Sequence, residues 1–156
     1  MPLSMMARAE AARLRTARPT AVNLAWGVDR VLAKLDDDPD AVVTEAIHVL
    51  EDDVRRSRDL GFRGARWLVH RLGGPVNVQT HCNAGALACV EWGTALGVIR
   101  ALWETEALGH VYLDETRPLL QGTRLTAWEL AQLGIAHTVV VDSAGPTVIA
   151  RGRSAS

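Results

Sequence analysis

The sequence contains a single lysine, Lys34, whereas the other sixteen of its seventeen basic residues are arginine. A nucleotide-binding P-loop requires a Gly-Lys-Ser/Thr sequence, and a Schiff-base enzyme requires a lysine in an apolar pocket. Lys34 instead stands just before the acidic turn 36–38. No Gly-x-Gly-x-x-Gly sequence occurs either, so the dinucleotide-binding fingerprint is absent. These absences exclude P-loop nucleotide binding and argue against lysine-based catalysis.

Cysteines and long apolar runs are also scarce. The two cysteines, Cys82 and Cys89, are too few for a disulfide scaffold and are not spaced as zinc ligands. No apolar run approaches about 18 residues, and the first residues contain arginine and glutamate in place of a signal-peptide core. The net charge of −1 includes no basic patch of the kind that binds nucleic acid. We therefore expect a cytoplasmic protein with reduced thiols and no nucleic-acid or membrane partner.

Apolar residues recur at intervals of three and four over the first 72 residues, which indicates helices. The sequence Arg18-Pro19-Thr20 is typical of a helix start, and the acidic turn before Pro39 is typical of the next one. Gly61 is expected to follow a helix end. We therefore predict a helical segment over residues 1–72.

The pattern changes after Gly73-Gly74-Pro75. Three short runs are typical of strands and two longer runs of helices: 76–80, 110–113 and 138–141, and 92–106 and 125–133. Gly134 ends the second helical run. Alternating strands and helices predict parallel pairing with right-handed crossovers. We therefore expect an α/β fold, with the helical segment followed by a Rossmann-like, three-layer parallel sheet over 73–156 that is incomplete in this chain.

Polar residues and glycines follow each predicted strand, in segments 81–85, 114–122 and 142–145. In an open parallel sheet, ligands bind beyond the carboxyl ends of the strands. These segments bring a thiol, carboxylates, an arginine and an amide to one edge, and the glycines let the backbone approach a ligand closely. The combination favours a small polar metabolite as the ligand.

Two residues of this edge are candidates for chemistry. Cys82 either sits at a turn entering a helix, where backbone N–H groups lower the pKa of a thiol, or is a small buried apolar residue. Asp142 ends an apolar strand, so it carries a raised pKa, is hydrogen-bonded by the following turn, or caps the next helix. Cys89 lies in an alanine-rich stretch and is expected to be a core residue of a helix.

Other residues have simpler interpretations. Glu115 and Arg117 either bind an anion or pair with each other, and the ion pair is favoured. Of the five histidines only His81 falls on the predicted edge, so no metal site is expected. The five tryptophans fall in helical patterns and are interpreted as core or interface residues: 26, 67, 92, 103 and 128.

Particular strings go beyond this general pattern. They are Arg18-Pro19-Thr20-Ala21-Val22-Asn23-Leu24, Thr80-His81-Cys82-Asn83-Ala84-Gly85, Gly93-Thr94-Ala95-Leu96-Gly97, Glu115-Thr116-Arg117-Pro118 with Gln121-Gly122, and Asp142-Ser143-Ala144. Together they strongly resemble the methylthioribose-1-phosphate isomerases of methionine salvage, a family related to regulatory subunits of translation initiation factor 2B. The Glu-Thr-Arg-Pro string is common to both groups, whereas Cys82 and Asp142 match only the isomerases.

The resemblance implies conversion of 5-methylthioribose 1-phosphate to 5-methylthioribulose 1-phosphate, without metal or organic cofactor, in a homodimer. By analogy, Cys82 and Asp142 form the catalytic pair, Arg18 binds the phosphate and Gln121 contacts the substrate. Opening of the phosphorylated ring requires an acid, and an aspartate with a raised pKa would supply that proton. Hydrogen then moves from C2 to C1 either through an enolate, with the thiol as base, or by direct hydride shift.

The chain also departs from the family pattern. The upstream Arg-Gly-Ala-Pro-type loop and the downstream Gly-Ala-Asp-Arg motif and Asn-Lys pair are absent. We therefore expect a fragment from the middle of the family, with residues 151–156 as an artefact of a stop or frameshift. Such a chain is expected to have little activity alone and to self-associate through an exposed sheet edge. The alternative functions are a ribose 1,5-bisphosphate isomerase and a non-catalytic regulatory module like the factor 2B subunits.

Overall fold

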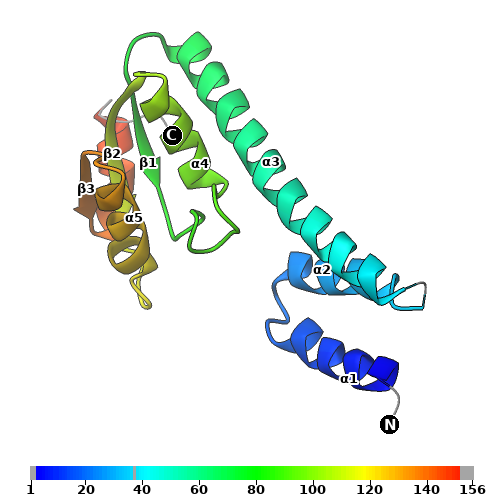
Figure 1. The fold of residues 1–156 in the computed structure, drawn as a ribbon. Coiled ribbons are helices and arrows are strands. Elements are labelled where there is room, and N and C mark those ends of the chain that lie inside the picture. Colours follow the sequence, from blue (N-terminus) through cyan, green and yellow to red (C-terminus); the bar gives the residue numbers. More distant parts are fainter. Residues whose placement is uncertain (1–2, 37, 152–156) are drawn as a thin grey trace. The chain divides into compact units, whose positions relative to one another are not determined.

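The computed structural model of the chain describes residues 3–36 and 38–151 (Figure 1). The helices and strands, in chain order, are α1 (Leu3–Thr16), α2 (Val22–Leu32), α3 (Pro39–Leu72), β1 (Val76–Thr80), α4 (Ala95–Glu104), β2 (Leu108–Asp114), the π-helix η1 (Gly122–Thr126), α5 (Ala127–Gln132), β3 (His137–Val140), the 3₁₀ turn η2 (Asp142–Ala144) and α6 (Gly145–Ala150). They divide into two compact units, Met1–Asp52 and Asp53–Ser156. The boundary falls inside α3, so the part of this helix from Asp53 onward belongs to the same unit as the sheet.

The first unit consists of α1, α2 and the beginning of α3. Arg15 at the end of α1 pairs with Asp29 of α2 at 2.8 Å, and Arg30 of α2 pairs with Glu45 of α3. No side chain that the structure describes in this unit is buried. The helices predicted for this part of the chain are confirmed, and ion pairs join them.

The second unit contains a parallel sheet in the order β1-β2-β3. Val78 pairs with Val111, and Val111 pairs with His137, so that side chains of the same face line up across the three strands. The predicted run 76–80 coincides with β1, the run 110–113 lies within β2, and the run 138–141 overlaps β3. The α/β fold with parallel pairing is confirmed.

The core of the second unit lies on one face of this sheet. Val111 and Leu113 of the central strand are fully buried, as are Ala101 and Leu102 of α4. Leu130 of α5 belongs to the same cluster, which Ala65 of α3 also joins, so these three helices cover the same face. The core holds the strands rigidly enough to position the segments that follow their carboxyl ends.

Gly61 does not follow a helix end, contrary to the sequence-based expectation, because α3 continues through it to Leu72. A Cβ atom built on Gly61 would lie 2.6 Å from the carbonyl oxygen of Gly97 and 2.8 Å from Nε1 of Trp92. The glycine therefore lets α3 approach α4 closely. Sequence alone does not distinguish this packing requirement from a helix stop.

Two further expectations need correction. Cys89 is half-buried and lies among turns between β1 and α4, outside any helix. Trp92 is also outside a helix, although it is buried as expected. The other four tryptophans are 43–63% exposed, so the core interpretation is wrong for them and the interface interpretation stays a prediction: Trp26, Trp67, Trp103 and Trp128. Gly134 does end the predicted helix, with α5 stopping at Gln132.

Among the described helices, none is long and apolar enough to span a membrane.

Candidate active site

The segments that follow the three strands meet at one edge of the sheet, as the sequence predicts. This edge carries Cys82 after β1, Gln121 after β2 and Asp142 after β3. The Nε2 atom of Gln121 donates a hydrogen bond to Sγ of Cys82 at 3.4 Å. Three of the four residues proposed for catalysis and binding therefore lie in one place.

Cys82 is half-buried in a left-handed backbone conformation, with φ of 65°. It does not enter a helix directly, because α4 begins only at Ala95. Its backbone N–H instead donates to Oγ1 of Thr116 at 2.8 Å, and its carbonyl oxygen accepts from Oγ1 of Thr126 at 2.6 Å. The backbone that carries the thiol is thus held by two threonines from the next crossover, a contribution that local sequence does not indicate.

Thr116 links all three segments. It is buried, with 3% of its surface exposed, and has a φ of 62°. Such a conformation costs a β-branched residue about 1–3 kcal/mol and persists only where several contacts fix it. Here Oγ1 donates to the carbonyl oxygen of Asp114 at 3.1 Å and accepts from Cys82, while the backbone N–H donates to Asp142 at 2.8 Å. One residue therefore joins the predicted catalytic cysteine to the predicted catalytic aspartate.

Gly122 is required for the same segment to fold back on the strand. A Cβ atom at this position would lie 1.8 Å from the backbone oxygen of Asp114. Any larger residue would therefore displace the chain between β2 and η1, which carries Thr116 and Gln121.

The side chain of Asp142 binds the backbone of the segment after β2. Its Oδ1 and Oδ2 atoms accept hydrogen bonds from the N–H groups of Thr116 and Arg117, each at 2.8 Å. The bond from Arg117 is the larger cause that lowers the pKa of Asp142 below its ordinary value, with the bond from Thr116 adding to it. The expected raised pKa is therefore wrong, because the ionised form has two backbone donors. The side chain does not cap the following turn either.

Arg117 contributes its backbone to Asp142, and its side chain is exposed. Among the residues that the structure describes, Glu115 and Arg117 form no ion pair with each other. The favoured interpretation of these two residues as a pair is therefore wrong. The charge of the Arg117 side chain acts on Asp142 and helps to lower the pKa of that carboxyl.

A buried carboxylate from α5 fixes the segment that carries Cys82. Glu129 is 7% exposed, and it accepts hydrogen bonds from Nδ2 of Asn83 at 2.8 Å and from the N–H groups of Ala86 and Leu87 at 2.7 and 3.2 Å. Sequence reasoning did not single out this residue. A signal was present, because Glu129 falls on the apolar side of α5 beside Leu130, and an acidic residue on a buried face requires partners.

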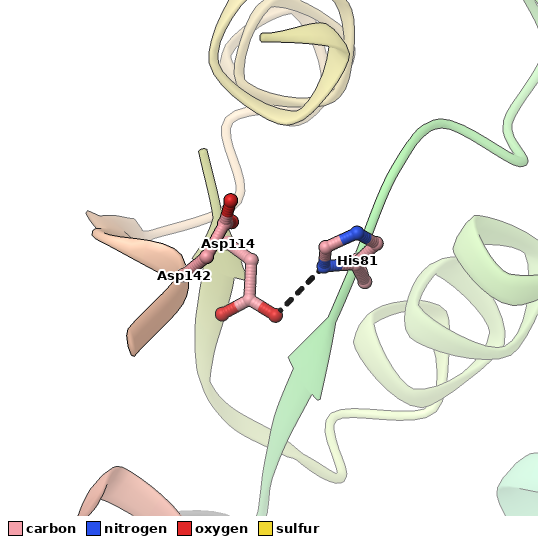
Figure 2. Close-up of side chains that lie close together, drawn as sticks. All are labelled: His81, Asp114 and Asp142. Atoms are coloured by element: carbon pink, nitrogen blue, oxygen red, sulfur yellow. Dashed lines mark hydrogen bonds and ion pairs between the residues drawn. The ribbon is translucent and has the colours of Figure 1, made fainter. Parts of the chain in front are cut away.

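His81, Asp114 and Asp142 bring nitrogen and carboxylate atoms within 4.8 Å of one another at this edge. In Figure 2, the imidazole of His81 faces the carboxylate of Asp114, whereas the carboxylate of Asp142 points away from this contact. A metal ion held by all three would compete with the hydrogen bonds that both carboxylates accept from Gln79, His81 and the backbone. The absence of a metal in the reaction stays a prediction.

Arg18 belongs to the first unit, in the turn between α1 and α2, where its side chain is exposed. The carbonyl oxygen of Arg18 accepts a hydrogen bond from the N–H of Ala21 at 2.9 Å, which shapes this turn. Its assignment as a phosphate ligand stays a prediction.

Isomerases and initiation factor subunits are both similar to this chain. A methylthioribose-1-phosphate isomerase from Alkalilimnicola ehrlichii is 48% identical over 149 residues, covering 93% of this chain and 42% of the relative. The crystal structure of 5-methylthioribose 1-phosphate isomerase from Pyrococcus horikoshii superimposes with a TM-score of 0.82 at 36% identity, over 92% of this chain and 41% of that one. The translation initiation factor eIF-2B subunit delta from A. fulgidus superimposes with a TM-score of 0.81 at 40% identity, over 97% of this chain and 45% of that one.

The chain therefore spans less than half the length of these three relatives. Both kinds of relative share its helical segment and its parallel sheet, as the TM-scores require. The family profile that matches is the initiation factor 2 subunit family, and it extends over residues 3–152. Because this match covers almost the whole sequence, the chain belongs to the initiation factor 2 subunit family.

Proposed function

We propose that the protein containing this chain is a sugar-phosphate isomerase that converts 5-methylthioribose 1-phosphate to 5-methylthioribulose 1-phosphate. The observation that carries the proposal is the junction at Thr116, which joins Cys82 to Asp142 at the carboxyl edge of the sheet. A pure interaction surface has no need of a thiol and a carboxylate in this arrangement. The isomerases of Alkalilimnicola ehrlichii and Pyrococcus horikoshii support the choice of substrate.

The residues at the edge suit the chemistry of this substrate. Gln121 binds the Cys82 thiol through its amide nitrogen, and a hydroxyl group of the sugar would contact this amide. Arg18 is assigned to the phosphate, and the assembly is assigned as a homodimer. The thiol faces the reacting carbons, either as the base of an enolate route or as part of the wall for a hydride shift. Asp142 acts as a carboxylate that fixes the backbone of residues 116–117 beside the sugar.

The test measures turnover in the protein that contains this chain. Conversion is followed by the ¹³C signal of the new C2 carbonyl, with 5-methylthioribose 1-phosphate and ribose 1,5-bisphosphate as separate substrates. Cys82→Ala and Asp142→Asn are each expected to lower kcat by at least about 100-fold. Cys89→Ala is the matched control, because this second thiol lies outside the site, and it should leave kcat unchanged. Equal effects of the two cysteine substitutions would contradict the proposal.

A second candidate is a non-catalytic regulatory module, which the 40% identity to the A. fulgidus initiation factor subunit favours. The same assay separates the two functions. Failure of the folded protein to turn over either sugar phosphate would support the regulatory module. Turnover of ribose 1,5-bisphosphate alone would support an isomerase function with that sugar phosphate as the substrate.

A further inference from the structure

The proposed reaction gives no role to His81, although this residue lies at the edge of the sheet that carries Cys82 and Asp142. It follows β1 directly, and its side chain is 58% exposed. Its Nδ1 atom lies 3.0 Å from Oδ2 of Asp114, which is itself 8% exposed (Figure 2). The other oxygen of Asp114, Oδ1, accepts a hydrogen bond from Gln79 at 2.9 Å. The carboxylate is therefore held from two sides and fixes the imidazole.

This contact determines which ring nitrogen faces a ligand. A carboxylate accepts hydrogen bonds, so Nδ1 carries the proton that it donates to Asp114. Nε2 is then the nitrogen left to exchange a proton with whatever binds at the edge. A carboxylate that orients an imidazole in this way is a recurrent arrangement in acid–base catalysis.

The proposed reaction needs such a group. Opening of the ring requires a proton on the leaving ring oxygen. Asp142 is poorly suited to give it, because two backbone N–H groups stabilise its ionised form. Imidazole is the side chain that ordinarily changes its charge near neutral pH. The charged groups that the structure places around the ring are Asp114 from β2, Asp142 after β3 and Arg117, which acts on Asp142.

We propose that His81, oriented by Asp114, transfers the proton that opens the sugar ring, an inference that rests on the proposed isomerase function. Nε2–H of the imidazolium gives its proton to the ring oxygen as the bond from that oxygen to C1 breaks, and the electron pair stays on oxygen. One hydrogen then moves from C2 to C1 by either route. The hydroxyl on C2 loses its proton to Nε2 as it becomes a carbonyl. The imidazolium is regenerated, and no oxidant or reductant is consumed.

Kinetics of variants test this role. His81→Asn keeps a donor toward Asp114 and removes Nε2, so we expect kcat to fall by about 10²–10⁴-fold with little change in KM. In His81→Asn, the decrease of kcat at alkaline pH should also disappear. His110→Asn is the matched control, because His110 lies on β2 and its Nε2 atom contacts Thr138 at 2.8 Å, outside the site. A kcat of His81→Asn within about threefold of the unsubstituted protein would overturn the proposal.

Chemical rescue separates proton transfer from a structural role. The exposure of His81 gives imidazole in solution access to the space that His81→Ala vacates, and we expect added imidazole to restore kcat at least about tenfold. Asp114→Asn should lower kcat without responding to imidazole, because it removes the orienting group and keeps the ring. A loss of activity in His81→Ala that imidazole does not restore, with an unchanged pH profile in His81→Asn, would assign His81 to structure alone.

An NMR measurement tests the geometry without activity, so failure of this inference is distinguishable from failure of the proposed function. Nitrogen-15 shifts of the neutral imidazole, assigned with His81→Asn, should show the proton on Nδ1. In Asp114→Asn this preference should be lost. A proton on Nε2 of the neutral ring in the unsubstituted protein would overturn the proposal even if the protein turns over no sugar phosphate.

Discussion

The two compact units are stabilised in different ways. In the first unit, α1, α2 and the start of α3 are joined by ion pairs such as Arg15–Asp29, and no described side chain is buried. In the second, residues such as Leu102 and Leu113 are completely buried between helices and sheet. Exposed ion pairs contribute little to the free energy of unfolding, whereas buried apolar side chains contribute about 1.5–3 kcal/mol each. The candidate catalytic residues Cys82 and Asp142 and the candidate substrate contact Gln121 all lie in the unit with the buried core.

The largest contrast is expected from matched leucine substitutions. Leu102→Ala removes a fully buried side chain from the second unit and should lower its free energy of unfolding by about 2–5 kcal/mol. Leu14→Ala removes a side chain that is 59% exposed in the first unit and should change stability by less than about 0.5 kcal/mol. Hydrogen exchange of amides in β2 and α1 during urea titration measures both. Similar effects of the two substitutions would contradict the distinction between the units.

Substitution of one glutamate in each unit is expected to give an intermediate difference in the loss of stability. Glu129→Gln replaces one carboxylate oxygen by an NH₂ group, which then faces a donor that this oxygen had accepted from, and we expect a loss of about 1–3 kcal/mol in the free energy of unfolding of the second unit. Because Glu129 fixes residues 83–87, the Cys82 thiol should also react faster with a thiol reagent. Glu45→Gln weakens the contact with Arg30 in the first unit and should cost about 1 kcal/mol or less.

Denaturant unfolding and the rate of thiol modification check this pair, with Cys89→Ala as the background so that Cys82 alone is followed. An unchanged reaction rate of Cys82 in Glu129→Gln would show that the loop does not depend on the buried carboxylate.

The smallest contrast concerns two aspartates whose pKa values both lie below the ordinary value of 3.8. The Arg15 side chain lowers the pKa of Asp29, and the backbone N–H groups of Arg117 and Thr116 lower that of Asp142. Each carboxylate therefore stabilises its unit above the ordinary pKa, and this contribution is lost as pH falls through the lowered value. Salt screens the Arg15–Asp29 pair, whereas hydrogen bonds to backbone groups depend less on salt.

Acid unfolding of each unit at low and high salt tests this difference. Asp29→Asn should reduce the acid sensitivity of the first unit only at low salt, and Asp142→Asn should reduce that of the second unit at both salt concentrations. An effect of Asp142→Asn that disappears in high salt would show that charge attraction, not backbone hydrogen bonding, dominates at this residue.

Much of the fold follows from local patterns. Apolar residues alternate in 76–80, and this pattern predicted a strand that the structure contains. Apolar residues recur at intervals of three and four before residue 72, and this period predicted the helices found there. Gly61 was misinterpreted because the sequence around a glycine does not distinguish a helix end from a close crossing of two helices. The edge of the sheet was also predicted, since parallel strands place their carboxyl ends together.

The sequence by itself determined the α/β class, the helical start of the chain and the presence of Cys82, Gln121 and Asp142 at one edge, because hydrophobic period and strand direction are local properties. The tertiary structure alone decided the ionisation of Asp142, the left-handed backbone at Thr116 and the contact between His81 and Asp114. These depend on hydrogen bonds between residues 25 or more positions apart. Such bonds form only after the core has brought the strand ends together, so no local pattern encodes them.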